Sequence, residues 1–198
     1  MTKIVAITGG IGAGKSTFSN VIKKKGFRLL DSDEVVSAIY KKPSKEFLDH
    51  LNNINLGESI KNGKINKKYI SKVIFSNKSI KKKLEKYIFN KTKESRKKFI
   101  ENEKAKKTKI VFFDIPLLFE NNLSKNFNQI ITIISSRKNR FKRLKKSKKM
   151  TKTLFNKILE SQTTDLVRIK KSDIIIYNNK TKKDYLKKIE NTLNKINI

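Results

Sequence analysis

The feature that most constrains the fold is a glycine-rich segment near the start of the chain. Residues 9–16 read Gly-Gly-Ile-Gly-Ala-Gly-Lys-Ser. A glycine, four residues and then Gly-Lys-Ser form the pattern of a phosphate-binding loop, provided that a strand precedes it and a helix follows. The β-branched run 3–8 predicts that strand, and residues 17–25 predict that helix. The segment therefore predicts an α/β domain whose first strand leads into a loop around a phosphate chain.

The residues of this loop suit a nucleoside triphosphate with Mg²⁺. Glycines let the backbone turn its N–H groups inward around the phosphates, and the following helix presents its positive end. Lys15 can reach the β- and γ-phosphates, and the Ser16 hydroxyl can hold Mg²⁺. We expect the nucleotide to be bound by Gly10, Ile11, Gly12, Ala13, Gly14, Lys15, Ser16 and Thr17. The loop alone does not identify the acceptor of a phosphoryl group.

Five apolar, β-branched runs predict strands that are buried on both faces of a sheet. They are residues 3–8, 27–30, 109–114, 129–135 and 173–177. Lysine-rich amphipathic segments separate them and predict helices, so the fold class is α/β with a parallel five-stranded sheet flanked by helices. A closing helix is expected over 182–198, with Tyr185, Leu186, Ile189, Leu193 and Ile196 on one face.

Two segments are expected to lie outside the nucleotide-binding core. Residues 34–107 are too long for one crossover helix, and they are helical in pattern with short breaks near Pro43 and at 57–63. We interpret them as an inserted helical subdomain. Residues 137–162 form a second helical, basic segment and are expected to act as a lid. The core then comprises 1–33, 108–136 and 163–198.

Two carboxylates end the second predicted strand, at Asp31 and Asp33. Carboxylates at the carboxyl end of a parallel strand face the ligand crevice, and residues two apart point the same way in extended backbone. One of them could accept a proton from an acceptor hydroxyl while the other supports Mg²⁺ through water. Alternatively, Asp33 simply caps a helix that begins near Glu34.

The third predicted strand ends in Asp114, after four apolar residues. This is the Walker-B arrangement, in which the carboxylate supports the Mg²⁺ shell. Pro116 stiffens the turn out of the strand. Of Leu117, Leu118 and Phe119, at least two are expected to be ordinary core residues.

Three arginines in the basic segment, Arg137, Arg140 and Arg143, are spaced so that they share roughly one helix face. Such cations can neutralise the charge that develops on a transferred phosphoryl group, an effect of roughly 10³–10⁵ in rate. The other interpretation is a solvated basic helix, which we expect to hold for at least one of the three.

The net charge of +32 has two interpretations. It would attract nucleic acid, anionic lipid or phosphorylated small molecules. However, the excess is spread along the chain and consists of lysine, whereas base recognition and bidentate phosphate binding favour arginine. We expect a charged surface set by composition rather than a nucleic-acid site. The absence of cysteine excludes disulfides and thiolate metal sites, and a single histidine excludes a histidine cluster. No apolar run is long enough to span a membrane, and no secretory signal is evident, so a cytoplasmic location is expected.

Taken together, these motifs resemble the dephospho-CoA kinase family over nearly the whole chain. The matching segments are Thr-Gly-Gly-Ile-Gly-Ala-Gly-Lys-Ser at 8–16, Asp-Ser-Asp at 31–33 and Pro-Leu-Leu-Phe-Glu at 116–120. Gln162, Ser172-Asp173 and Asn178 match later positions of the family pattern. The segment at 116–120 is the most discriminating of these matches.

The resemblance implies a phosphotransferase that moves the γ-phosphoryl group of ATP to the 3′-hydroxyl of dephospho-CoA, the last step of coenzyme A biosynthesis. Asp33 would be the base, the insertion would hold dephospho-CoA, and the basic segment would close as the lid. The implied catalytic residues are Asp33, Lys15, Arg143 and, as second choice, Arg140. Asn178 joins the nucleotide-binding residues, and Ser16 and Asp114 are the metal-binding ones. The implied substrate-binding residues are Asp31, Asp33, Pro116, Leu117, Leu118 and Glu120.

The chain departs from the family pattern at several places. The usual His-Pro pair of the helical domain is Phe89-Asn90, and the lone His50 lies elsewhere, where we expect a surface helix residue. The position of a second lid arginine falls on Ser147. Smaller changes occur at Asn66-Lys67, Ser172 and Lys180. None of these affects the phosphate loop or the proposed base, so they concern substrate affinity and lid geometry.

We therefore expect a cytoplasmic kinase with ATP and Mg²⁺ as cofactors and dephospho-CoA as its small-molecule partner. No nucleic acid or membrane partner is expected, and the chain is expected to be a monomer or a weak homo-oligomer. A nucleoside or nucleoside-monophosphate kinase is the first alternative, because it shares the loop and the lid. A basic nucleic-acid-binding protein built on the same fold is the second.

Overall fold

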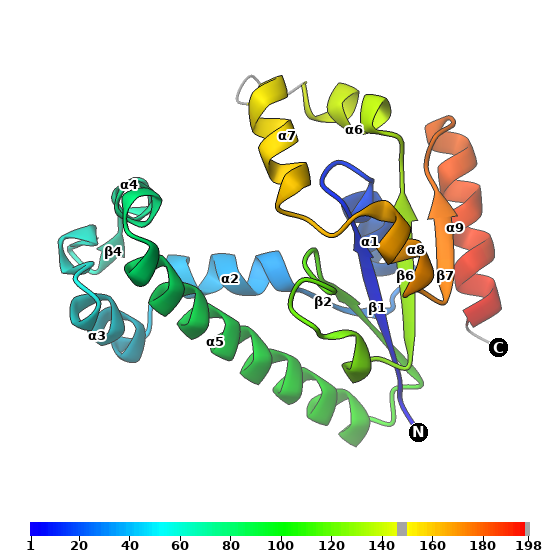
Figure 1. Cartoon of the computed structure of the whole chain (residues 1–198). Coiled ribbons are helices and arrows are strands. Elements are labelled where there is room, and N and C mark those ends of the chain that lie inside the picture. The colour runs from blue at the N-terminus through cyan, green and yellow to red at the C-terminus, as the bar shows by residue number, and fades with distance from the viewer. Residues whose placement is uncertain (146–149, 197–198) are drawn as a thin grey trace. The chain divides into compact units, whose positions relative to one another are not determined.

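The computed structural model describes residues 1–145 and 150–196. The chain forms two compact units, the first made of Met1–Asp31 with Glu103–Ile198 and the second of Ser32–Asn102. Figure 1 shows the helices and strands of both. No helix within the described residues is long and apolar enough to cross a membrane.

The first unit is built on a five-stranded parallel sheet with the order β2-β5-β1-β6-β7. Its strands are β1 (Lys3–Gly9), β2 (Arg28–Asp31), β5 (Ile110–Asp114), β6 (Gln129–Ile134) and β7 (Ile174–Tyr177). The predicted α/β fold class is confirmed, and each strand lies within a residue or so of the run that predicted it. Parallel pairing requires crossover segments between the strands, and these supply the helices.

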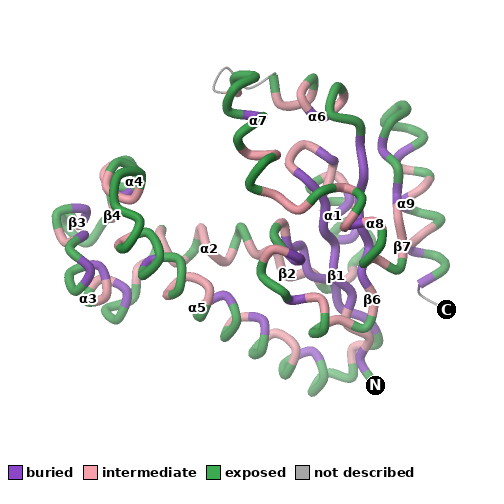
Figure 2. The backbone as a smooth tube through the Cα atoms, in the orientation of Figure 1, coloured by how far each residue is buried: buried purple, intermediate pink, exposed green. Residues whose placement is uncertain are grey.

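The core explains why these runs form strands. Val5, Ile7, Phe112, Ile131 and Ile133 lie on one face of the sheet and are completely buried. Alternate residues such as Ala6, Val111 and Phe113 are equally buried on the opposite face, as expected for strands covered on both sides. The central strands are accordingly buried along most of their length in Figure 2.

Helices α1 (Lys15–Lys24) and α9 (Lys182–Ile196) cover the first face and contribute Phe18, Ile22 and Ile189 to its core. The predicted apolar face of the closing helix is confirmed as far as Ile196. The basic segment and the residues after it form α6 (Arg137–Leu144), α7 (Lys152–Glu160) and α8 (Asp165–Lys170). Ser136, Thr151 and Thr164 cap these three helices by accepting a backbone N–H three residues on.

The second unit is mainly helical. It contains α2 (Ser32–Lys41), α3 (Lys45–Asn53), a 3₁₀ turn (Gly57–Ser59), α4 (Lys67–Ser76) and most of α5 (Lys78–Ala105), which continues into the first unit. Its own core contains Phe47, Leu51, Leu56, Ile70 and Leu84, all from α3, the turn after it, α4 and α5.

The insertion also contains an element that the sequence pattern did not predict. Strands β3 (Ile60–Lys61) and β4 (Lys64–Ile65) pair as a small antiparallel hairpin inside the segment expected to be helical. Its turn residues are Asn62 and Gly63, which have φ values of 49° and 71°. An Asn-Gly turn with both residues left-handed matches the twist of paired strands, which explains the hairpin.

His50 differs from its expected surface position. It lies on α3 as a half-buried residue, and its ring stacks on Tyr87 with 4.4 Å between ring centroids. Phe47 also stacks on Tyr87, with 5.1 Å between the centroids. The histidine is therefore part of the aromatic packing of the second unit.

Candidate active site

The phosphate loop lies between β1 and α1, as its pattern predicts. The backbone N–H of Ala13 donates to the carbonyl of Gly10 over 3.1 Å, which closes the turn. Gly12 and Gly14 have φ values of 71° and 118°, a left-handed region that favours glycine. Gly14 is the N-cap of α1, so the first N–H groups of that helix lie in the loop.

Lys15 opens α1 and extends back along the loop. Its Nζ donates to the carbonyl of Gly9 over 3.0 Å. The ammonium group therefore lies within the loop that precedes its own helix, where the positive end of the helix also acts. Ser16 and Thr17 follow in the first turn of α1.

Two carboxylates end neighbouring strands in the first unit. The Cα atoms of Asp31 on β2 and Asp114 on β5 are register partners, so both side chains lie on the same face of the sheet at its carboxyl end. Asp114 is 5% exposed, and its Oδ2 accepts a hydrogen bond of 2.7 Å from Ser19 Oγ. Ser19 is a site residue that the sequence analysis missed, although it lies one helical turn after Ser16.

Asp33 lies in the first turn of α2, two residues beyond the end of β2. The helix already begins at Ser32, so Asp33 is inside the helix and is not its cap. The capping interpretation is therefore not what the structure shows. The roles of Asp31 and Asp33 in binding and proton transfer stay predictions.

The segment from Pro116 to Glu120 contains residues of the hydrophobic core and one residue, Glu120, that forms polar contacts with distant parts of the chain. Leu118 and Phe119 are buried, whereas Leu117 is 42% exposed, so two of the three apolar residues are core as expected. Glu120 connects this segment to α8 and the residues before it. Its Oε1 accepts the backbone N–H of Thr163 over 2.7 Å and Arg168 Nη2 over 3.1 Å.

Arg140 and Arg168 form a buried charge cluster with acidic partners. Arg168 Nη1 lies 3.1 Å and Arg140 Nη1 lies 3.4 Å from the same Asp165 oxygen. The side chains of Arg140 and Arg168 are only 3% and 2% exposed. Burial lowers the pKa of Arg140. The nearby charge of Arg168 lowers this pKa further, whereas the carboxylate of Asp165 acts in the opposite direction. The Arg140 guanidinium lies directly against Gly10, where a Cβ would collide with it.

A cavity of about 70 Å³ adjoins this cluster. Arg140 and Arg168 line it, and their Nε atoms are buried without a hydrogen-bond partner. The volume is enough for about two water molecules, which would satisfy such donors. The remaining lining residues come from the basic segment, the turn before α8 and the first residue of α8: Arg137, Leu159, Gln162, Thr163, Thr164 and Asp165.

Replacing Arg168 by Met is expected to destabilise the protein by roughly 3–5 kcal/mol. The substitution leaves the carboxylates of Asp165 and Glu120 without their main buried counter-ion. Urea unfolding measures the loss, and Lys170→Met on the exposed side of the same helix is the matched control. A loss no larger than that of the control would show that the cluster contributes little to stability.

Arg143 and Asn178 meet at the phosphate loop. Arg143 Nη1 donates to the carbonyl of Gly12 over 3.1 Å, and Asn178 Nδ2 donates to the carbonyl of Ala13 over 2.8 Å. Both residues were expected at the nucleotide, Arg143 on the transferred phosphoryl group and Asn178 among the binding residues. Both expectations stay predictions. Of the three arginines on this helix, Arg137 is exposed, as expected for at least one of them.

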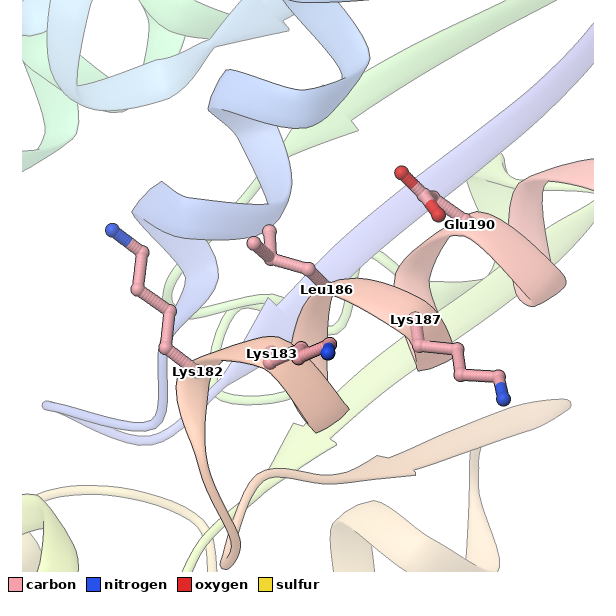
Figure 3. A pocket seen from close by; sticks show the side chains of 5 residues that line it. All are labelled: Lys182, Lys183, Leu186, Lys187 and Glu190. Atoms are coloured by element: carbon pink, nitrogen blue, oxygen red, sulfur yellow. The ribbon is translucent and has the colours of Figure 1, made fainter.

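Gln162 gives the loop a further contact, because its Oε1 accepts the backbone N–H of Ile11 over 3.1 Å. Ser147, the expected position of a second lid arginine, lies outside the described residues. An open hollow of about 620 Å³ along α9 is lined by side chains of Lys182, Lys183, Leu186, Lys187 and Glu190, shown in Figure 3. It contains none of the predicted site residues.

The residues present fit a magnesium ion that is held mainly by phosphate. No cluster of three or more His, Asp or Glu side chains that could hold a metal occurs among the described residues. Mg²⁺ usually takes one or two protein oxygens together with phosphate oxygens and water. Ser16, next to the phosphate loop, and the buried carboxylate of Asp114 supply oxygens of this kind.

The parallel sheet, the phosphate loop at the end of β1 and the basic helices after β6 define a P-loop kinase. The family model described as dephospho-CoA kinase matches residues 3–184. The chain belongs to the dephospho-CoA kinase family.

Similar proteins agree with this assignment. Dephospho-CoA kinase of Fusobacterium nucleatum is 36% identical over 190 residues, which cover 94% of this chain and 95% of that protein. Dephospho-CoA kinase of Streptococcus mutans is 33% identical over 201 residues, which cover 99% of this chain and 98% of that protein. The solved dephospho-CoA kinase from Campylobacter jejuni is 25% identical, with a TM-score of 0.76 and coverage of 99% of this chain and 98% of that one.

Proposed function

We propose that this chain transfers the γ-phosphoryl group of ATP to the 3′-hydroxyl of dephospho-CoA and releases coenzyme A and ADP. The observation that carries the proposal is the complete phosphate loop between β1 and α1 in a chain that belongs to the dephospho-CoA kinase family. Phosphoryl transfer depends mainly on positioning and on charge stabilisation, and the loop supplies both.

The loop binds the triphosphate through its backbone N–H groups, and Lys15 neutralises charge on the β- and γ-phosphates. Ser16 and Asp114 hold Mg²⁺, which supplies charge neutralisation on the phosphate oxygens when it is bound. Asp33 accepts the proton of the ribose hydroxyl, and Asp31 supports the metal shell or the substrate. Arg140 and Arg143 were both expected to neutralise the transferred group. Arg140 is paired with Asp165, and Arg143 donates to carbonyl groups of the loop.

In this proposal the helical insertion at 34–107 binds dephospho-CoA. The assignment of Pro116, Leu117 and Glu120 to substrate binding stays a prediction, whereas Leu118 is completely buried and belongs to the core. The basic helices after β6 close over the nucleotide and exclude water, which limits hydrolysis of ATP. The enzyme acts in the cytoplasm as a monomer or weak homo-oligomer, and its basic surface attracts anionic substrates without requiring a nucleic acid.

The proposal is tested by an assay of ADP release with Mg·ATP and different acceptors. Dephospho-CoA is compared with AMP, with other nucleoside monophosphates and with no acceptor. ADP release that depends on dephospho-CoA supports the proposal. Release that depends on a monophosphate would instead assign the chain to the neighbouring nucleotide kinases. No stimulation by any acceptor, together with steeply salt-dependent binding to duplex DNA, would favour the nucleic-acid alternative.

A further inference from the structure

Three consecutive carbonyl groups of the phosphate loop are each held by a side chain from outside the loop. Arg143 Nη1 donates to Gly12 O over 3.1 Å, and Asn178 Nδ2 donates to Ala13 O over 2.8 Å. The phenol of Tyr185 donates to Gly14 O over 3.0 Å. We call Arg143, Asn178 and Tyr185 the carbonyl clamp. Its members come from α6, from the residue after β7 and from α9.

The clamp is itself a connected network. Arg143 Nη2 donates to the backbone carbonyl of Asn178 over 2.7 Å, and Arg143 Nη1 donates to Ser135 Oγ over 2.9 Å. Ser135 Oγ in turn donates to the same Asn178 carbonyl over 2.7 Å. Arg143 Nη1 also reaches Ala13 O at 3.4 Å. The planar guanidinium presents five N–H donors on three nitrogen atoms in a fixed fork, whereas an ammonium group has three donors on a single nitrogen.

Each member of the clamp acts as a donor at neutral pH. Asn178 and Tyr185 are 6% and 3% exposed. Burial raises the pKa of Tyr185, so its hydroxyl keeps the proton that it donates to Gly14. The guanidinium of Arg143 has only N–H donors to offer and no acceptor. Its described hydrogen bonds all go to oxygen atoms of the protein.

The direction of a carbonyl fixes the direction of the next N–H. In a trans peptide these two groups lie in one plane and point to opposite sides. Holding the carbonyls of Ala13 and Gly14 against Asn178 and Tyr185 therefore orients the N–H groups of Gly14 and Lys15 the opposite way. Backbone N–H groups of this loop are the ones that bind phosphate.

The fit around Gly14 shows how closely the clamp encloses the loop. A Cβ at Gly14 would collide with Asn178 Nδ2 and would lie 3.2 Å from the ring of Tyr185. The loop is rich in glycine and would otherwise lose much conformational freedom when it binds phosphate. A loop that is already ordered avoids that loss and binds more tightly.

We infer that the carbonyl clamp pre-orients the phosphate loop, and that Arg143 is a positioning residue that acts through the loop carbonyls and not on the transferred phosphoryl group. The inference rests on the nucleotide-binding part of the proposed function and is independent of the acceptor. It predicts that the carbonyl clamp increases the affinity of the loop for the phosphates that ATP and ADP share.

The test measures binding of Mg·ADP and Mg·ATP to the full chain by calorimetry, without an acceptor, in Arg143→Lys and Tyr185→Phe. Because ADP lacks the transferred group, a residue that acts only on that group leaves ADP binding unchanged, whereas a residue that acts through the loop weakens the binding of both nucleotides. We expect Arg143→Lys to weaken both by the same factor, about tenfold, as loss of charge-assisted hydrogen bonds to the loop predicts. Tyr185→Phe removes one hydroxyl and should weaken both by about threefold to tenfold.

Arg28→Lys and Tyr177→Phe are the matched controls, because both side chains are exposed and make no described contact with the loop. Their affinities should equal that of the unchanged chain. In steady-state assays, Arg143→Lys should raise KM for ATP far more than it lowers kcat.

Unchanged ADP affinity in Arg143→Lys overturns the inference, and a fall in kcat alone would then place Arg143 on the transferred group. Unchanged affinity in Tyr185→Phe overturns the clamp as a unit. Thermal unfolding of each variant checks its fold, and Tyr185→Phe keeps the buried ring and so remains informative if Arg143→Lys is unstable. Failure to phosphorylate dephospho-CoA would contradict the proposed acceptor and leave these binding results interpretable.

Discussion

Replacing Asp33 by Asn is expected to lower kcat by roughly 10²–10⁴-fold while Mg·ATP still binds with nearly unchanged affinity. Asparagine keeps the shape of the side chain and its place in the first turn of α2, but it cannot take a proton from the ribose hydroxyl. The loss should therefore fall on the chemical step. Steady-state kinetics with dephospho-CoA, together with calorimetry for the nucleotide, separates the two effects.

Two further variants make this experiment specific. Asp49→Asn applies the same change on the exposed surface of α3 and should leave kcat unchanged. Asp31→Asn should mainly raise the Mg²⁺ concentration needed for activity, because Asp31 lies beside Asp114 at the end of the sheet. Full activity in Asp33→Asn would remove Asp33 from the role of base. A large loss of kcat in Asp31→Asn alone would assign the role of base to Asp31.

Replacing Lys15 by Met is expected to lower kcat/KM for ATP by roughly 10²–10³-fold. Methionine keeps much of the aliphatic length but removes the charge that, in the proposed function, neutralises the β- and γ-phosphates. The Lys15 ammonium lies within the loop, where its Nζ donates to the Gly9 carbonyl. The expected loss is therefore in stabilisation of developing charge as well as in binding.

Steady-state kinetics at varied ATP measures this loss. Lys24→Met, an exposed lysine in the last turn of the same helix, is the matched control and should behave as the unchanged chain. Equal kinetics for Lys15→Met and Lys24→Met would contradict the assignment of the loop as the triphosphate site.

The fold could be predicted because its main signals are local. All five predicted runs became strands of the sheet. The expected burial on both faces holds for the central strands β1, β5 and β6, whereas the edge strands β2 and β7 are partly exposed because each has only one neighbouring strand. The phosphate loop is a contiguous pattern, and its flanking strand and helix lie where that pattern requires. The hairpin at 60–65 also has a local signal, Asn62-Gly63, which the prevailing helical pattern of the insertion concealed.

The contacts within the site could not be predicted in the same way, because they join residues that are distant in the sequence. Helical spacing placed Arg140 and Arg143 on roughly one face, but it could not show that Asp165 neutralises the first and that loop carbonyls bind the second. Tyr185 was expected only as a core residue of the closing helix. Its hydroxyl bonds Gly14, which is 171 positions away in the chain.

The most direct test of the central claim is to identify the product formed from Mg·ATP and dephospho-CoA. Mass spectrometry together with ³¹P NMR determines whether a phosphate was added and to which hydroxyl. We expect a single product, coenzyme A, with the new phosphate on the ribose 3′-oxygen and one ADP released for each molecule formed. ADP released without any phosphorylated product, or a phosphate attached elsewhere, would contradict the proposed function.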